Sequence, residues 1–269
     1  MKLQCGRFSL PLDKPLVMGV VNVTPDSFSD GGRFEDAEAA LAHAHRLIED
    51  GADILDVGGE SSRPGAAPVS VEEELRRVLP VVRQLRDVPV SVDTRRPQVM
   101  RAALDFGASM INDIEALAAP GALEAVASSD CAVCLMHMKG DPATMQQDPS
   151  YNDVVAEVSS FLEQKSEKAM QAGIARERIV VDPGFGFGKT VAHNLALLGS
   201  LQALSPLPVL AGLSRKSLLG KLTGRPVEER LAGSLALALL ALQGGAKILR
   251  VHDVKETRDV IAIWEGMRG

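Results

Sequence analysis

The feature that most constrains this chain is a unit that recurs along it: an apolar run of strand length, a polar residue that closes the run, and a loop. Residues 16–32 show the unit most clearly. Their apolar run ends at Asn22 and is followed by Pro, Asp, Ser and Gly residues that are typical of turns. A continuous apolar strand indicates a parallel sheet that is covered on both faces.

The unit repeats about eight times, and helical patterns separate the strands, as in (β/α)8 barrels. Strands are predicted at 17–21, 53–57, 90–94, 109–113, 132–136, 179–182, 208–213 and 247–251. Helices are predicted at 35–50, 121–128, 153–172 and 228–242. Another begins near Ser70, where Glu73 completes a capping box, and another has Pro97 in its first turn. A last helix runs to Trp264. We expect a single-domain α/β (β/α)8 TIM barrel over residues 1–269, with a short extended lead-in or hairpin at residues 1–12. An open, doubly wound sheet is the alternative.

Charge and residue content exclude several classes of protein. The net charge of −6, without any basic stripe, argues against nucleic-acid binding. The first residues lack the apolar core of a signal peptide, and no apolar run reaches membrane-spanning length, so we expect a cytoplasmic protein with no membrane partner. Three cysteines do not suggest a disulfide framework. Cys131 and Cys134 lie on opposite faces of a predicted strand, which favours two small core residues over metal ligands.

Polar side chains at the carboxyl ends of the predicted strands are the candidate functional residues. In a (β/α)8 barrel these ends share one rim, where active sites lie. The candidates are Asn22, Arg63, Asp93, Asn112, Asp182, Lys216, Arg250 and His252. The aspartates that close β-branched runs need partners, because an unpaired carboxylate near the barrel interior is costly. The cations suggest a cradle for an anion.

Simpler interpretations exist for some of these residues. Asp113 and Asp253 are the kind of residue that caps helices or forms turns. The loop 184–190 is rich in glycine but is not a P-loop, because Pro183 occupies the position that requires the first glycine. No Ser-His-Asp order or metal-binding helix motif is present. Aspartates and an amide, together with cations, suit an aminopyrimidine ring that carries a diphosphate.

In order along nearly the whole chain, the motifs MGVVNVTPDSFSDGG, ILDVGGESSRPGA, VSVDTRRP, INDI, LMHMKGDPATMQ, VDPGFGFGK, GLSRKS and LRVHDVKET resemble those of the dihydropteroate synthase family of pterin-binding barrels. The resemblance implies condensation of a hydroxymethyl-dihydropterin diphosphate with 4-aminobenzoate in folate synthesis. It also implies that sulfonamides compete for the aminobenzoate site. The small-molecule partners expected are therefore a pterin diphosphate and 4-aminobenzoate.

The resemblance also assigns roles to individual residues. The pterin would be bound by Asp93, Asn112, Met136, Asp182, Phe187 and Lys216. The diphosphate would be held by Asn22, Arg63, Arg250 and His252, with Asn22 near a Mg²⁺ ion. The aminobenzoate would be framed by Ser62, Pro64, Phe185 and Ser214. Asp93, Lys216, Arg63, Arg250 and His252 would form the catalytic set.

The implied mechanism is a dissociative displacement at the pterin methylene, with loops 22–34 and 59–68 closing over the site to exclude water. One departure from the family pattern is Ser62, where a threonine is usual, and it bears on sulfonamide sensitivity more than on activity. The alternatives are a methyltetrahydrofolate corrinoid methyltransferase, a Schiff-base aldolase that uses Lys216, and a noncatalytic pterin-binding protein. The very apolar helix predicted at 228–242 suggests a homodimer.

Overall fold

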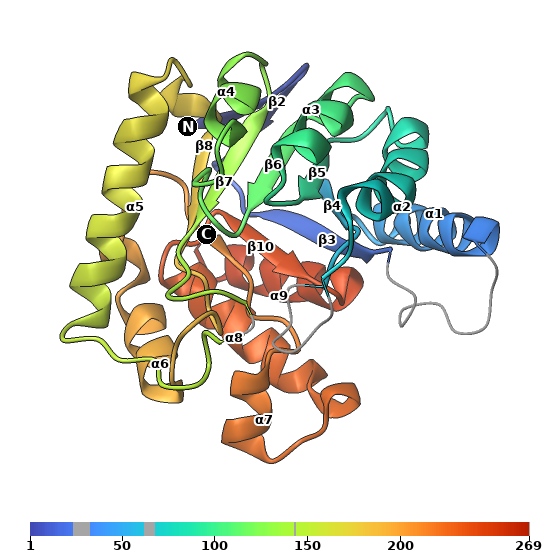
Figure 1. Cartoon of the computed structure of the whole chain (residues 1–269). Coiled ribbons are helices and arrows are strands. Elements are labelled where there is room, and N and C mark those ends of the chain that lie inside the picture. Colours follow the sequence, from blue (N-terminus) through green and yellow to red (C-terminus); the bar gives the residue numbers. More distant parts are fainter. Residues whose placement is uncertain (24–32, 62–67, 143, 269) are drawn as a thin grey trace.

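The centre of the molecule is an eight-stranded parallel sheet (Figure 1). The computed structural model describes residues 1–23, 33–61, 68–142 and 144–268. The strands are β3 Leu16–Asn22, β4 Ile54–Gly58, β5 Val90–Asp93, β6 Met110–Asp113, β7 Ala132–Met136, β8 Ile179–Asp182, β9 Leu210–Ala211 and β10 Ile248–Val251. Their order in the sheet is β8-β7-β6-β5-β4-β3-β10-β9.

The two edges of this sheet meet and close it into a barrel. Val181 in β8 forms a parallel bridge with Val209, and its N–H donates to the Pro208 carbonyl at 3.0 Å. The predicted (β/α)8 barrel is therefore confirmed, and the open, doubly wound alternative is wrong. Closure matters for function because it brings the carboxyl ends of all the strands to one rim.

Helices surround the strands on the outside of the barrel (Figure 1). They are α1 Arg33–Glu49, α2 Val71–Gln84, α3 Pro97–Asp105, α4 Ala122–Ala127, α5 Val154–Gln171, α6 Val191–Gly199, α7 Ser217–Thr223, α8 Leu231–Gln243 and α9 Val254–Gly266. Several begin where the sequence indicates: Ser70 Oγ accepts the Glu73 N–H at 3.2 Å, Pro97 opens α3, and Asp153 caps α5. Within the described part of the chain, none of the helices combines the length and apolarity that a membrane crossing requires.

Two hydrophobic clusters fill the molecule. The larger one lies between the strands and the helices and is almost entirely aliphatic. The smaller one fills the barrel interior and includes Leu3 and Cys5 of an antiparallel hairpin, β1 Lys2–Cys5 and β2 Phe8–Pro11. Its members also include the first residues of β3, β6, β7 and β10. The hairpin therefore closes the amino-terminal end of the barrel, which confirms the predicted lead-in and leaves the opposite end for ligands.

The cysteines behave as the strand pattern predicts. Cys131 belongs to the outer cluster and Cys134 to the inner one, so the two side chains lie on opposite faces of the sheet. All three cysteines are free and buried. In the described part of the chain, no group of three or more His, Cys, Asp or Glu side chains is arranged to hold a metal ion.

Three local predictions differ from the structure. The strand expected at 208–213 is only Leu210–Ala211, and on its amino-terminal side Pro208 lacks the N–H that could extend the ladder. The helix expected at 228–242 begins at Leu231, because residues Val227–Glu229 form a separate 3-10 turn. The Arg230 side chain, between the two, donates to the Arg215 and Arg225 carbonyls. The capping box at Ser70 is half formed, since the Glu73 carboxylate binds arginines of α2 and not the Ser70 N–H.

Candidate active site

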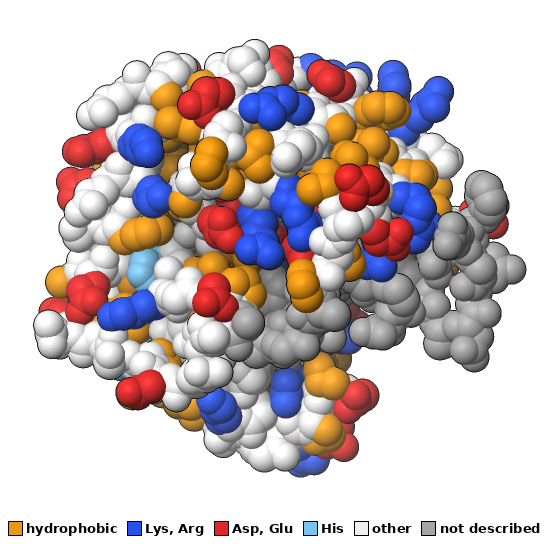
Figure 2. All heavy atoms as spheres, in the orientation of Figure 1, with side chains coloured by type: hydrophobic (Ala, Val, Ile, Leu, Met, Phe, Trp, Pro, Cys, Tyr) orange, Lys and Arg blue, Asp and Glu red, His pale blue; other side chains and the backbone are white. Residues whose placement is uncertain are grey.

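The strand register places the predicted polar residues side by side at the carboxyl rim. Asn22 is opposite Gly58, Gly58 is opposite Asp93, and Asp93 is opposite Asn112. Further round the barrel, Met136 is opposite Asp182. Figure 2 shows basic and acidic side chains gathered near the centre of this face, with hydrophobic side chains beside them. Residues far apart in the sequence therefore share one surface.

Arg250 links two carboxylates at this rim. Its Nε lies 2.6 Å from Asp56 Oδ2 and its Nη2 lies 2.9 Å from Asp93 Oδ2. Asn112 Nδ2 also donates to Asp56 Oδ2, at 3.1 Å. Asp56 is fully buried, and its Oδ1 has no hydrogen-bond partner among the described residues. Asp56 thus anchors the guanidinium from below, while Asp93, at the strand end, can be reached from the rim.

Asp182 lies close to the Arg250 side chain. A Cβ placed on Gly212 would lie 3.8 Å from Arg250 Cβ and 3.9 Å from Asp182 Oδ2, so a side chain at position 212 would stand between them. The other oxygen, Asp182 Oδ1, accepts the Gly184 N–H at 2.7 Å. Asp182 and Arg250 therefore lie at the same end of the barrel, as the interpretation of the strand ends requires.

Lys216 approaches the rim from the loop that follows β9. Its Nζ donates to the Phe185 carbonyl and lies 4.6 Å from the centroid of the Phe187 ring, a cation–π contact. Ser214 Oγ, two residues earlier, lies 3.0 Å from His252 Nδ1 and accepts the His252 N–H at 3.2 Å. These contacts join the ends of β8, β9 and β10.

Burial shifts the pKa values of the charged groups at this rim. Burial raises the pKa of Asp93 to about 7, with Arg250 opposing the shift and Asp56 adding to it. The pKa of Asp182 is also raised by burial, although Lys216 and the Gly184 N–H oppose the rise. Burial lowers the pKa of Lys216 to about 8, against the attraction of Asp182. Groups that titrate near neutrality in one cluster are typical of functional sites.

The two phenylalanines of the glycine-rich loop differ in burial. The Phe185 ring is fully buried in the outer core cluster, and its carbonyl accepts from Lys216. The Phe187 ring is partly exposed and lies beside Lys216. Of the two rings, Phe187 is therefore the one placed to contact a ligand, and the role predicted for Phe185 at the aminobenzoate remains a prediction.

Part of the predicted site falls outside the described residues. Ser62, Arg63 and Pro64 all belong to that part, as do most residues of the loops that were expected to close over the site. The roles predicted for these residues stay predictions. The other candidates are described. Six lie in the last two residues of strands (Asn22, Asp93, Asn112, Met136, Asp182 and Arg250), and His252 directly follows β10. Phe185, Phe187, Ser214 and Lys216 lie in the loops that follow β8 and β9.

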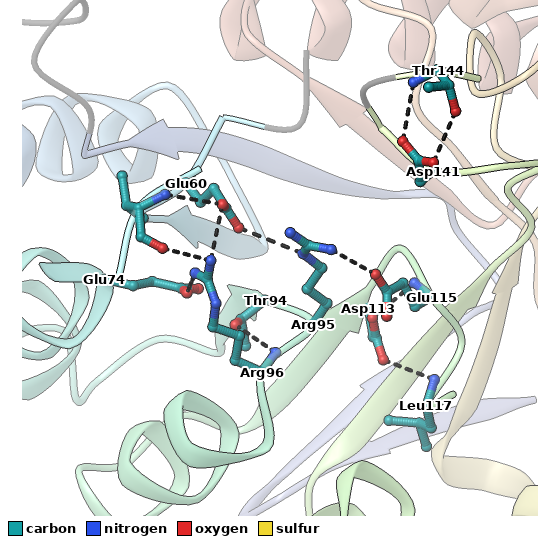
Figure 3. A network of polar contacts seen from close by, with 11 residues as sticks. Glu60, Glu74, Thr94, Arg95, Arg96, Asp113, Glu115, Leu117, Asp141 and Thr144 are labelled. Atoms are coloured by element: carbon teal, nitrogen blue, oxygen red, sulfur yellow. Dashed lines mark hydrogen bonds and ion pairs between the residues drawn. The ribbon is translucent and has the colours of Figure 1, made fainter. Parts of the chain in front are cut away.

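The sequence did not reveal an ion-pair network beside the rim (Figure 3). Arg96 donates to the Glu60 carboxylate at 3.0 Å, to the Val69 carbonyl at 2.7 Å, and to the buried Glu74 carboxylate. Glu60 also accepts the Val69 N–H at 3.3 Å, so the stems of the loop between residues 61 and 68 are joined. Arg95 continues the network to Glu115 at 2.9 Å. Arg95 and Arg96 lie just beyond the end of β5, after Thr94, and two cations at a strand end were the sequence signal for this network.

Asn22, the residue predicted to lie near a magnesium ion, is among the described residues. Asn22 ends β3 at the rim, partly buried, and an amide oxygen is the kind of hard donor that Mg²⁺ accepts. Mg²⁺ usually keeps several water molecules and takes phosphate oxygens as ligands. The residues therefore fit an ion that arrives with the diphosphate, and they do not form a protein cage.

Together, these observations define a class: a (β/α)8 barrel whose carboxyl rim binds a small, polar, partly anionic ligand. The sequence profile of the family described as "Pterin binding enzyme" matches residues 18–252. The chain belongs to this pterin-binding family.

Named relatives narrow the comparison. The chain is 52% identical to the dihydropteroate synthase of Escherichia coli K12 over 270 residues, covering 98% of this chain and 96% of the relative. It is similar to the structure of Xanthomonas albilineans dihydropteroate synthase with 4-aminobenzoic acid, with a TM-score of 0.94, 55% identity, and 100% and 98% of the two chains covered. A Yersinia pestis dihydropteroate synthase in complex with a sulfonamide drug matches with a TM-score of 0.94, 48% identity, and coverage of 100% and 99%.

Proposed function

We propose that this chain is a dihydropteroate synthase. It joins 6-hydroxymethyl-7,8-dihydropterin diphosphate to 4-aminobenzoate and releases 7,8-dihydropteroate and diphosphate. The observation that carries this conclusion is the cluster at the rim, where Asp93 and Asp182 lie beside the cations Arg250 and Lys216. The identity of about half of all residues to dihydropteroate synthases supports it.

Acceptors and donors on the barrel strands would bind the pterin. A carboxylate accepts two parallel N–H bonds from an aminopyrimidine edge, and Asp182 and Asp93 are strand-end carboxylates that lie beside the cations of the rim. The Asn112 amide offers a donor and an acceptor between them. Lys216 supplies a cation, while Met136 and the partly exposed Phe187 ring offer apolar contact to the ring faces.

Cations would stabilise the diphosphate as it leaves. We assign the cationic role to Arg250 and Arg63, and hydrogen bonding to the diphosphate to His252 and Asn22. The bond between the pterin methylene carbon and the diphosphate oxygen breaks, and its electron pair goes to the diphosphate. Preorganised positive charge at that oxygen lowers the barrier, which is usually the largest catalytic contribution. A magnesium ion held by Asn22 and the phosphates would supply further charge neutralisation.

Arg250 has a second effect in this scheme. Its guanidinium bonds both Asp56 and Asp93. A pterin edge that donates to Asp93 takes over one of these contacts, so the guanidinium needs to keep only its bond to Asp56. The Nη2 group is then available for the diphosphate. Binding of the ring and stabilisation of the leaving group are coupled through one side chain.

The neutral aromatic amine of 4-aminobenzoate attacks the methylene carbon and forms the new C–N bond. The amine then loses a proton to water or to the released diphosphate, so no strong general base is required. Ser62, Pro64, Phe185 and Ser214 are the residues we assign to this substrate. Ser214 is the best supported of them, because its hydroxyl lies 3.0 Å from His252 Nδ1. We propose that sulfonamides compete at this position.

A steady-state assay of diphosphate release tests the proposed function. Release should require both the pterin diphosphate and 4-aminobenzoate, and a mass equal to that of 7,8-dihydropteroate should appear in equal amount. A sulfonamide should inhibit competitively with 4-aminobenzoate. Turnover of a methylated folate with a corrinoid acceptor, without diphosphate chemistry, would contradict the proposal.

We also propose a homodimer that uses the surface around α8. Large apolar side chains are exposed there: Leu222 of α7, Val227, and Leu231 and Leu240 of α8. Such a patch is typical of a surface that associates with a second copy. Light scattering after size exclusion should give twice the chain mass of 28.6 kDa, and Leu240→Glu should shift it toward the monomer. The cytoplasmic location remains a prediction that cell fractionation tests.

A further inference from the structure

Lys189 is a buried cation for which the proposed mechanism has no role. It ends the glycine-rich loop between β8 and α6, which resembles a phosphate-binding loop without having its spacing. Only 2% of the residue is exposed. A lysine is almost never buried to this extent unless its ammonium group has specific partners.

The partners of Lys189 are four acceptor atoms from two loops, three of them at 3.0 Å or less. Its Nζ lies 3.0 Å from His137 Nδ1 and 2.9 Å from each of the Gly184 and Phe187 carbonyls, and the His137 carbonyl is at 3.3 Å. An ammonium group has three N–H donors and can supply all three shorter contacts. The glycine-rich loop is therefore wrapped around the amine, and Lys189 is an internal tie of the loop and not a ligand for phosphate.

Backbone geometry shows how closely the two loops meet at this tie. Gly184 has a φ of +67°, and a Cβ added there would lie 1.9 Å from the His137 carbonyl oxygen. No side chain other than hydrogen fits at this position. The contact brings the loop that follows β7 directly against the loop that follows β8, with the amine of Lys189 between them.

Both loops hold Asp182. The His137 N–H donates to the Asp182 carbonyl at 2.9 Å, and the Gly184 N–H donates to Asp182 Oδ1 at 2.7 Å. The next residue, Phe185, provides the carbonyl that binds Lys216. Lys189 therefore fixes the two residues that hold Asp182, Gly184 at its carboxylate and His137 at its backbone carbonyl. The residue after Gly184 is Phe185, the partner of Lys216.

We propose that Lys189 is a positioning residue for the pterin site, which orients Asp182 through the loop and stabilises its carboxylate form with a buried positive charge. This inference rests on the proposed function, because it assumes that Asp182 binds the pterin. Lys189 itself need not touch the substrate.

The charges around Asp182 support the electrostatic part. Burial raises the pKa of Asp182, and the groups that oppose this rise are Lys216, the Gly184 N–H, Lys189 and Arg250. Burial lowers the pKa of Lys189 to about 7, while Asp182 raises it and Lys216 lowers it further.

His137 does not add a competing charge. Burial and the nearby Lys189 lower the pKa of His137 to about 3, so its ring is neutral over the working range of pH. Below pH 7 the lysine is therefore the charged member of the pair. Its charge is present in the range where Asp182 is protonated as the pH falls, so removing it should make protonation of Asp182 easier.

Binding of 6-hydroxymethylpterin, which has no diphosphate, tests the proposal by calorimetry between pH 5 and pH 8. Three variants separate charge from shape: Lys189→Met removes charge and donors, Lys189→Gln keeps two N–H donors without charge, and Lys189→Arg keeps the charge. Lys168→Met, which removes an exposed lysine of α5, is the matched control. Circular dichroism confirms that each variant is folded.

For Lys189→Met and Lys189→Gln, we expect weaker pterin binding. In a plot of affinity against pH, the decline on the acid side (the acid limb) should move to higher pH by on the order of one unit. At a given pH on that limb, this shift is about a tenfold difference in affinity. Lys189→Arg should keep the acid limb of the wild type, and Lys168→Met should match the wild type throughout. Should Lys189→Met fail to fold, Lys189→Gln carries the same test.

The same loss of affinity at every pH in Lys189→Gln would overturn the electrostatic role, and unchanged affinity at every pH would overturn both roles. Failure of the wild-type protein to bind 6-hydroxymethylpterin is a different outcome, since it would contradict the proposed function itself. Because the ligand is the same in all experiments, its own titration cancels in the comparison with wild type.

Discussion

The burial of Arg250 at this rim is offset by its ion pairs with two carboxylates. Its guanidinium bonds Asp56 and Asp93, and these carboxylates hold its pKa above the ordinary value despite the cost of burial. A buried ion pair adds little stability, but removal of one partner leaves an uncompensated charge. The arrangement is therefore better explained by ligand binding than by stability, since a ligand can exchange partners with each member.

Asp182 is the residue for which loss of charge should have the clearest effect. Asp182→Asn removes the negative charge and replaces one acceptor oxygen by an NH₂ group, which opposes the donors of an aminopyrimidine edge. We expect the free energy of pterin binding to fall by about 3 kcal/mol, roughly 100-fold in Kd. Calorimetry with 6-hydroxymethylpterin measures it, and Asp105→Asn, on the exposed end of α3, should change nothing. Unchanged affinity in Asp182→Asn would remove this residue from the site.

Lys216 should set the alkaline limit of activity. Burial lowers its pKa to about 8 against the attraction of Asp182 and Asp93, so its positive charge is present below this pH and is lost as the pH rises through it. The value of kcat/KM for the pterin diphosphate should therefore fall above pH 8. Lys216→Arg keeps the charge and should be slower, but without the decline up to pH 10. An identical alkaline limb in both proteins would assign it to another group.

At the scale of elements, strands were easier to predict than loops. β7 has the predicted bounds, because a continuous apolar run followed by His137 is a local signal. The polar residues at strand ends share this signal, so the position of the candidate site could be predicted from the sequence. The tie at Lys189 could not, since it depends on carbonyls that only the folded chain brings together. The partners of Arg96 were missed for the same reason.

Asp113 also lies at a strand end, but its role is to hold a turn. Its carboxylate accepts the N–H groups of Glu115 and Leu117 at 2.8 Å each, across a turn in which Ala116 and Leu117 have φ of +50° and +57°. The sequence also allowed this interpretation, as a turn former.

Replacing Asp113 by Ala removes both acceptors from a turn whose left-handed residues are costly. We expect the free energy of unfolding in urea to fall by about 2–3 kcal/mol. Asp259→Ala, at an exposed position of α9, is the control and should have no measurable effect. Equal stabilities of the two variants would show that the carboxylate does not hold the turn.

The two ends of the barrel have different roles, packing at the amino-terminal end and ligand binding at the carboxyl end. At the amino-terminal end, the hairpin fills the interior with apolar side chains, and Cys5 Sγ donates to the Ser109 carbonyl at 3.2 Å. At the carboxyl end, the interior contains Asp56 and Arg250, groups that cost free energy to bury. The closed end therefore supplies part of the packing free energy that allows the open end to hold charges.

This division can be tested with a core residue of the hairpin. Leu3 is fully buried in the barrel interior, so Leu3→Ala should lower the free energy of unfolding by about 3 kcal/mol. The same variant should keep kcat and KM within about twofold of wild type, because the active site of such barrels lies at the opposite, carboxyl-terminal rim. Met267→Ala, at a side chain that is 78% exposed, controls for loss of an apolar group. A large rise in KM for the pterin in Leu3→Ala, in protein that is fully folded at the assay temperature, would show that the two ends are coupled through the barrel interior.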